Sequence, residues 1–205
     1  MPRAEVPLHT KLTPPGLHRR LLPRPALTAK LREALDYRLT LVQAGTGYGK
    51  STALAALAGS QAALPLAWCS LDPSDADPQR FLSYLIAALR LKLPDLSESP
   101  QVALQELSSA GSPGSWSTVI DTLINALASA LSGPLLIVVD DYDCVAVSPE
   151  ANALTERFLV YLPSHLHVIL STRHPIDFQR LTAWRAKGQV LEIGREALAF
   201  QPDEI

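Results

Sequence analysis

The chain has 205 residues, of which 47% are hydrophobic and 19% charged, and its formal net charge at pH 7 is −2. This composition predicts one soluble α/β domain of ordinary size, and the slightly acidic balance gives no overall basic signal for nucleic-acid binding. The most apolar run, Leu135 to Val139, is far too short to cross a bilayer. No early apolar segment is typical of a secretion signal. A cytoplasmic protein without membrane contact is therefore expected.

The two cysteines of the chain, Cys69 and Cys144, lie in or beside apolar, strand-like runs. Both are expected to be buried, reduced thiols, because neither their number nor their spacing is typical of a metal site. His165 and His167 alternate on one expected strand, but no third ligand lies nearby in the sequence. The histidines are therefore expected to have structural or surface roles.

The N-terminal part of the chain, residues 1–25, is rich in proline and arginine. Such a composition is typical of an extended arm, and residues 1–10 are expected to be partly disordered. Two interpretations stay open for residues 11–25: the same extended arm, or a segment that wraps around the domain and lines the edge of a ligand. The globular domain is expected over residues 26–205.

A glycine-rich turn between a short apolar strand and a helix of small residues is the most informative feature of the chain. The strand is expected over residues 39–43 and the helix over residues 50–58. Glycines in the turn let backbone N–H groups approach phosphate oxygens, and the helix N-terminus adds a partial positive charge. Lys50 is expected to reach the β- and γ-phosphates, and the Ser51 hydroxyl is expected to bind Mg²⁺. With Ala44 as a tolerated replacement of the first glycine of the usual pattern, the predicted nucleotide-binding residues are Gly45, Thr46, Gly47, Tyr48, Gly49, Lys50, Ser51 and Thr52.

Strands and helices alternate along the rest of the chain. Further strands are predicted over residues 64–71, 135–141, 167–173 and 190–193, and helices over residues 26–35, 78–93, 116–131, 150–161 and 177–186. This alternation is typical of the α/β class, with a parallel, doubly wound sheet flanked by helices. Residues 94–115 are rich in serine, proline and glycine and are expected to form a mobile surface insertion with one short helix over 102–107.

Charged residues follow two of the buried strands, at the edge where parallel α/β sheets bind ligands. Asp140 and Asp141 end an aliphatic strand, and two adjacent carboxylates there repel each other unless a cation is bound. Asp140 is therefore expected to hold Mg²⁺ together with Ser51, and Asp141 to orient or deprotonate an attacking water. Arg173 ends another strand and is expected to contact the γ-phosphate, with a plain surface cation as the alternative. Lys50, Asp141 and Arg173 are the predicted catalytic residues, and Asp143 is expected to be a turn residue.

Together these segments resemble one family, the MalT-like (LuxR-associated) branch of the signal-transducing STAND ATPases. The resemblance covers residues 11–205 and rests on the ordered set of motifs, since the loop and the acidic strand alone are generic. The motifs are Lys11-Leu12-Thr13-Pro14-Pro15 with Arg24, Gly47-Tyr48-Gly49-Lys50-Ser51, Trp68-Cys69-Ser70-Leu71-Asp72, Val138-Val139-Asp140-Asp141-Tyr142, Leu170-Ser171-Thr172-Arg173 and Leu191-Glu192-Ile193-Gly194.

The resemblance implies a P-loop NTPase fold of the ASCE type, with a parallel five-stranded sheet of order 5-1-4-3-2. It implies ATP or ADP with Mg²⁺ as ligands, ADP at rest, self-association in the ATP state, and slow hydrolysis that resets a regulatory switch. Arg24, in the segment that precedes the domain, is expected to help hold the nucleotide base. The family's helical, winged-helix, sensor and helix-turn-helix domains are absent from these 205 residues. DNA contact is therefore expected only through a C-terminal domain that is not present here.

Two other functions stay open from the sequence. One is a scaffold or interaction domain, or a truncated remnant, that retains the fold without hydrolysing nucleotide, since missing lid domains could be needed for affinity. The other is a phosphotransferase acting on a small molecule, against which no acceptor-binding signature is found.

Overall fold

The computed structural model describes residues 7–17, 22–60, 65–109, 115–200 and 204. Its centre is a sheet of five parallel strands in the order β2-β3-β4-β1-β5. The strands are β1 (Leu39–Gln43), β2 (Leu66–Ser70), β3 (Leu135–Asp140), β4 (Leu166–Thr172) and β5 (Val190–Ile193). The predicted order 5-1-4-3-2 is confirmed, and all five strands end at the same edge of the sheet.

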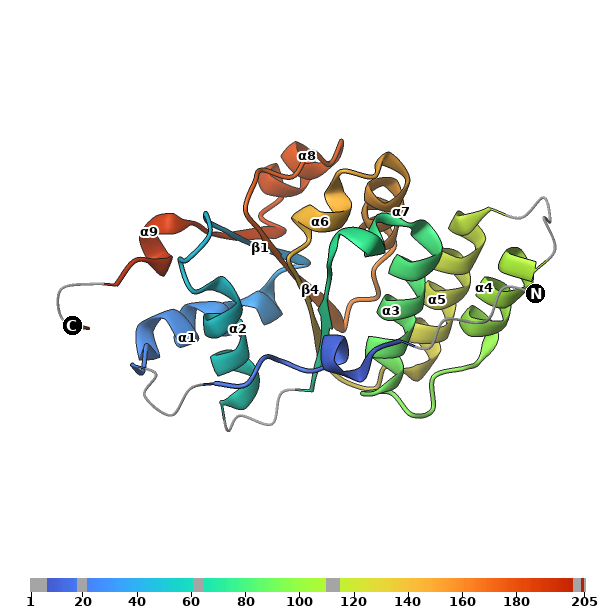
Figure 1. Cartoon of the computed structure of the whole chain (residues 1–205), viewed down its shortest axis with the longest axis horizontal. Coiled ribbons are helices and arrows are strands. Elements are labelled where there is room, and N and C mark those ends of the chain that lie inside the picture. Colours follow the sequence, from blue (N-terminus) through green and yellow to red (C-terminus); the bar gives the residue numbers. More distant parts are fainter. Residues whose placement is uncertain (1–6, 18–21, 61–64, 110–114, 201–203, 205) are drawn as a thin grey trace.

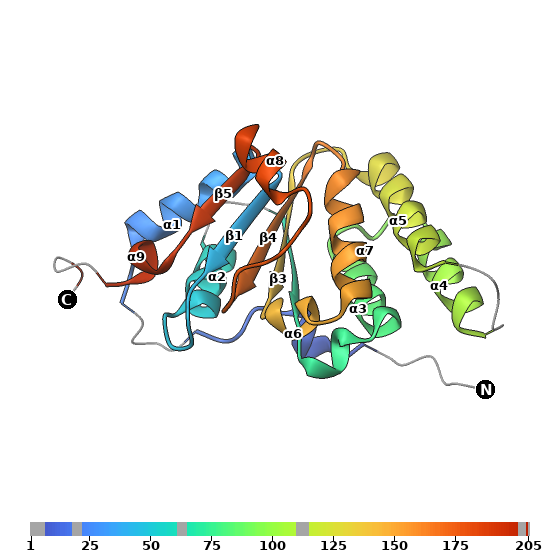
Figure 2. The ribbon, with the colours of Figure 1, turned by 90° about the horizontal axis from the view of Figure 1, so that it is seen from above.

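Helices cover both faces of the sheet (Figures 1 and 2). The α-helices are α1 (Pro25–Arg32), α2 (Lys50–Gly59), α3 (Pro78–Arg90), α4 (Ser99–Ser109), α5 (Trp116–Ala130), α6 (Asp143–Ala146), α7 (Pro149–Val160), α8 (Leu181–Ala186) and α9 (Arg195–Leu198). Short 3-10 helices are η1 (His9–Leu12), η2 (Glu33–Asp36) and η3 (Pro73–Ala76). Within the described part of the chain, no helix is long and apolar enough to cross a membrane.

Alternate residues of each strand pack into two separate apolar layers. In β3, Leu136 and Val138 pack with the leucines of α1 and α2, whereas Ile137 and Val139 pack with α3, α5 and α7. All four of these side chains are buried. Burial on both faces explains why β3 is a continuous aliphatic run rather than an alternating pattern. The charged end of β3 therefore extends from a strand that is buried on both faces.

Residues 94–109 contain more helix than was expected for the surface insertion. Helix α4 extends beyond the predicted residues 102–107 at both ends and packs against α3 and α5. Leu96 and Leu104 are buried in the main apolar layer. The serine- and glutamine-rich exposed face of this helix hides its short apolar stripe in the sequence. Residues 110–114 lie outside the described residues.

The other differences concern the ends of helices. The helix predicted over residues 177–186 begins only at Leu181, because the residues before it form a turn that buries Phe178 against Tyr142. In the N-terminal arm, Lys11 forms ion pairs with Asp72 at 2.6 Å and with the fully buried Asp75 at 2.5 Å. This part of the arm is fastened to the domain, while residues 1–6 and 18–21 lie outside the described residues.

Candidate functional site

The glycine-rich turn joins the end of β1 to the start of α2, as the sequence predicts. Gly47 has φ +85° and Gly49 has φ +74°. Residues with a Cβ atom rarely adopt these backbone conformations. Residues 45–49 are exposed, whereas Lys50, the first residue of α2, is only 7% exposed. The backbone of the turn is therefore open to a ligand while the lysine stem is fixed in the protein.

The ammonium group of Lys50 bonds to the turn that it follows. Its Nζ donates to the carbonyl oxygens of Ala44 at 2.8 Å and Gly45 at 3.1 Å. Among the described contacts of Lys50 there is no ion pair with a carboxylate. The first described backbone bond into α2 comes from Ala53 to the Gly49 carbonyl, so the N–H groups before it lie at the helix start. A buried cation beside the N–H groups of a helix start is suited to an anion.

The acidic end of β3 lies next to the end of β4. Asp140 is 3% exposed and accepts a hydrogen bond from the Ser171 hydroxyl, whose oxygen in turn accepts the Asp141 N–H at 3.0 Å. Asp141 has φ +54° and is the only described non-glycine residue with positive φ. This left-handed turn separates the two carboxylates: Asp140 stays in the strand, and Asp141 is half-buried at the edge of the sheet.

The charges around Asp141 show which predicted residues the fold brings together. Burial raises the pKa of Asp141, and the carboxylates of Asp140 and Asp143 raise it further. Arg173 and Lys50 act in the opposite direction. The predicted base, lysine and arginine are thus close enough to influence one another, although they come from β3, α2 and the end of β4. A carboxyl group with a raised pKa at such an edge is suited to accepting a proton.

Asp143 is not the simple turn residue that was expected. It begins α6, and its carboxylate accepts hydrogen bonds from the backbone N–H of Arg173 at 3.0 Å and from Nε of Arg173 at 2.7 Å. Arg173 is therefore hydrogen-bonded to α6. The sequence pattern that predicts a phosphate contact does not reveal this partner. The ion pair forms because β3 and β4 are neighbours and their ends meet.

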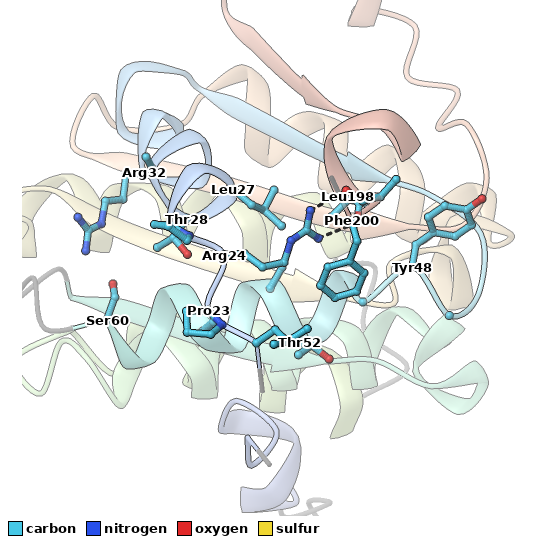
Figure 3. Close-up of a pocket in the computed structure, with 18 residues that line it drawn as sticks. Pro23, Arg24, Leu27, Thr28, Arg32, Tyr48, Thr52, Ser60, Leu198 and Phe200 are labelled. Atoms are coloured by element: carbon cyan, nitrogen blue, oxygen red, sulfur yellow. Dashed lines mark hydrogen bonds between the residues drawn. The ribbon is translucent and has the colours of Figure 1, made fainter. Parts of the chain in front are cut away.

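A cavity of about 730 Å³ lies beside the glycine-rich turn (Figure 3). Its volume is within the usual range of small-molecule sites. The lining is mainly apolar and comes from the start of α1, from the turn, from α2 and from the segment after α9; it includes Pro23, Leu27, Tyr48, Thr52, Ala53 and Phe200. The cavity shares Gly47 and Gly49 with the turn, so the two form one continuous site.

Arg24 lies at this cavity, but its polar atoms are bound to the protein. Its guanidinium donates to the carbonyl oxygens of Leu198 and Ala199, both at 2.7 Å, and pairs with Glu204 at 3.0 Å. The same group lies 4.6 Å from the centre of the Phe200 ring. Arg24 therefore fastens the segment after α9 as one wall of the cavity (Figure 3), and Phe200 becomes a lining residue that sequence reasoning had not assigned to the site.

Comparison with known proteins connects this geometry to a family. No protein-family profile matches the chain. The chain is 37% identical over 197 residues to the HTH-type transcriptional regulator MalT of Serratia proteamaculans. The aligned segment covers 95% of this chain and 21% of that regulator. It thus spans about one fifth of the length of the curated relatives that it matches.

Two solved structures have the same fold. The first is a Walker-type ATPase of Pyrococcus abyssi, with a TM-score of 0.52 and 18% identity over 93% of this chain and 57% of that one. The second is a STAND protein with a tetratricopeptide repeat sensor from Pyrococcus horikoshii, with a TM-score of 0.54 and 13% identity over 93% of this chain and 25% of that one. The P-loop ATPase fold expected from the sequence is confirmed.

Proposed function

Because this chain is a MalT-like P-loop ATPase domain, we propose that it is a regulatory module that binds Mg-ATP and ADP and hydrolyses ATP slowly. The observation that carries the proposal is the continuity between the turn around Lys50 and the apolar cavity of about 730 Å³. A nucleotide needs both parts, since its phosphates require N–H groups and a cation and its base requires an apolar slot.

The phosphate end of the proposed site uses residues of three elements. Lys50 would exchange its two carbonyl partners for the β- and γ-phosphates, and the N–H groups at the start of α2 would bind phosphate oxygens. Ser51 and Asp140 would hold Mg²⁺, which supplies positive charge that neutralises the phosphates. The Asp141 carboxylate would orient an attacking water and accept its proton, a role supported by its raised pKa and its position at the sheet edge. Arg173 would contact the terminal phosphate.

The base end of the proposed site is the apolar cavity. Leu27, Ala53 and Phe200 would pack against the base, and Arg24 would hold the Phe200 segment in place. The preference for adenine over guanine follows from the family resemblance. The relatives are HTH-type transcriptional regulators, and we therefore propose that the module serves transcription control, with DNA contact and inducer sensing outside these residues.

Calorimetric titration with Mg-ATP and Mg-ADP tests the proposal. We expect micromolar binding of both nucleotides, and a loss of about 100-fold or more in Lys50→Ala because charge-assisted hydrogen bonds to phosphate are removed. Lys92→Ala, which removes an exposed lysine after α3, is the matched control and should bind normally. Binding that is unchanged in a folded Lys50→Ala variant would refute the phosphate role, and a folded wild-type chain that binds neither nucleotide would favour the scaffold function.

A further inference from the structure

The guanidinium of Arg173 is held by one carboxylate. Nε of Arg173 donates to Asp143 at 2.7 Å, and Nη2 lies 2.6 Å from the same Asp143 oxygen. Nη2 also lies 3.9 Å from the sulfur of Cys144. Two of the three guanidinium nitrogens therefore have partners on α6, and the backbone N–H of Arg173 adds a third bond to Asp143.

This ion pair lies at the border of the glycine-rich turn. Ala44, Gly45 and Arg173 line one cavity of about 440 Å³ on the side of the turn that faces β5. The Arg173 side chain is 42% exposed, whereas the Asp143 side chain is only 10% exposed. An anion bound to the turn would thus approach a guanidinium whose other side is already neutralised by a carboxylate.

Neutralisation by Asp143 has a direct effect on which anions can recruit Arg173. A phosphate gains less from a guanidinium that already has a carboxylate partner, because either the ion pair must separate or two anions must share one cation. A nucleoside diphosphate lacks the terminal phosphate that would compete for Arg173. The competition therefore acts on the triphosphate and leaves the diphosphate unaffected.

We propose that Asp143 is a specificity-determining residue that acts through Arg173: its ion pair opposes recruitment of Arg173 by a terminal phosphate and so lowers the preference of the site for nucleoside triphosphate over diphosphate. The inference rests on the proposed nucleotide function. It assigns to Asp143 a positioning role, since the carboxylate itself contacts the arginine and not the nucleotide. The resting domain is biased toward the diphosphate in this way.

The test compares the affinities of the chain for ADP and for a non-hydrolysable triphosphate, adenylyl imidodiphosphate, at constant Mg²⁺. Asp143→Asn keeps an oxygen that can accept the Arg173 N–H and removes the negative charge. Asp143→Ser is a second variant that retains an acceptor, in case the first folds poorly. Asp121→Asn is the matched control, because Asp121 forms a comparable double hydrogen bond to Arg157 at 2.7 Å on α5 and α7.

We expect the ratio of triphosphate to diphosphate affinity to rise roughly 5- to 10-fold in Asp143→Asn, with ADP affinity unchanged, as for a typical coupling between two interactions. Arg173→Ala should lower the ratio, and the double variant should equal Arg173→Ala, because the proposed effect of Asp143 on the affinity ratio passes through the arginine. A ratio that is unchanged in both folded Asp143 variants, or that rises equally without Arg173, overturns the inference while nucleotide binding stands. A wild-type chain that binds neither nucleotide overturns both proposals.

Discussion

Replacement of Arg24 by alanine should separate recognition of the base from recognition of the phosphates. Arg24 makes two hydrogen bonds of 2.7 Å to the carbonyl groups of Leu198 and Ala199 and an ion pair with Glu204. No described contact of Arg24 involves the glycine-rich turn. The substitution therefore removes the fastening of one cavity wall and leaves the phosphate cradle intact.

The size of the effect follows from the contacts and from the order that they impose. Hydrogen bonds from a charged group contribute about 1.5–3 kcal/mol each. We take the low end of this range because the guanidinium is partly exposed. The free energy of unfolding should therefore fall by roughly 2–4 kcal/mol. Without Arg24, residues 198–200 must be ordered when the base binds. Partial ordering of three residues costs about 1.5–3 kcal/mol, which corresponds to a roughly 10- to 100-fold loss of ATP affinity.

The assay compares ATP with inorganic tripolyphosphate in Arg24→Ala, Lys50→Ala and Arg90→Ala. Tripolyphosphate has no base, so its affinity should be unchanged in Arg24→Ala and reduced in Lys50→Ala. Among the described residues, the Arg90 side chain forms an exposed ion pair with Glu98 at 3.5 Å, and its removal should affect neither ligand. The reasoning is wrong if Arg24→Ala weakens ATP and tripolyphosphate by the same factor, or if ATP affinity does not change.

Two further substitutions address catalysis and stability. Asp141→Asn should abolish phosphate release measured with a coupled assay. It should also raise the free energy of unfolding at pH 7 by less than about 1 kcal/mol, because a half-exposed carboxylate with a raised pKa opposes folding when it is charged. The stability difference should vanish below the ordinary pKa of 3.8, where the carboxyl group is protonated in the unfolded chain as well as in the native one, and a difference that persists there would contradict this origin. Asp75→Ala should lower the free energy of unfolding in urea by about 3 kcal/mol, because Lys11 and Arg80 both lose a fully buried carboxylate partner. Asp121→Ala, in a surface ion pair, should cost less than about 1 kcal/mol, and equal effects of the two substitutions would show that burial of Asp75 is irrelevant.

The structural features that the sequence predicts best are those determined by residues close together in the chain. The aliphatic run of β3 predicts a buried strand, which was found at the expected residues, and the glycines of the turn permit the left-handed backbone that Gly47 and Gly49 adopt. The strand order has a different origin: alternation of strands and helices indicates a parallel sheet, but its order came from the family resemblance. Helix α4 was predicted too short because serine, proline and glutamine at its two ends interrupt the apolar pattern around the buried Leu104.

Contacts between distant residues could not be predicted in the same way. The partners of Arg24 lie 174 to 180 positions further along the chain, and nothing in the local pattern selects Leu198 or Glu204. Asp143 begins the helix that follows β3, and Arg173 follows β4, so their ion pair depends on which strands are neighbours. The sequence placed Arg173 at the end of a strand and Arg24 in the segment before the domain, while the atoms that each arginine binds required the fold.

The position of β1 in the sheet has a consequence for synthesis of the chain. This strand carries the glycine-rich turn, yet it is hydrogen-bonded only to β4 and β5, which follow more than a hundred residues later. At translation rates of about 5–20 residues per second, β1 waits roughly 5–25 s for its first partner. During that interval Leu39, Leu41 and Val42 have no sheet to cover them, and the nascent strand is a natural target for chaperones and for incorrect pairing.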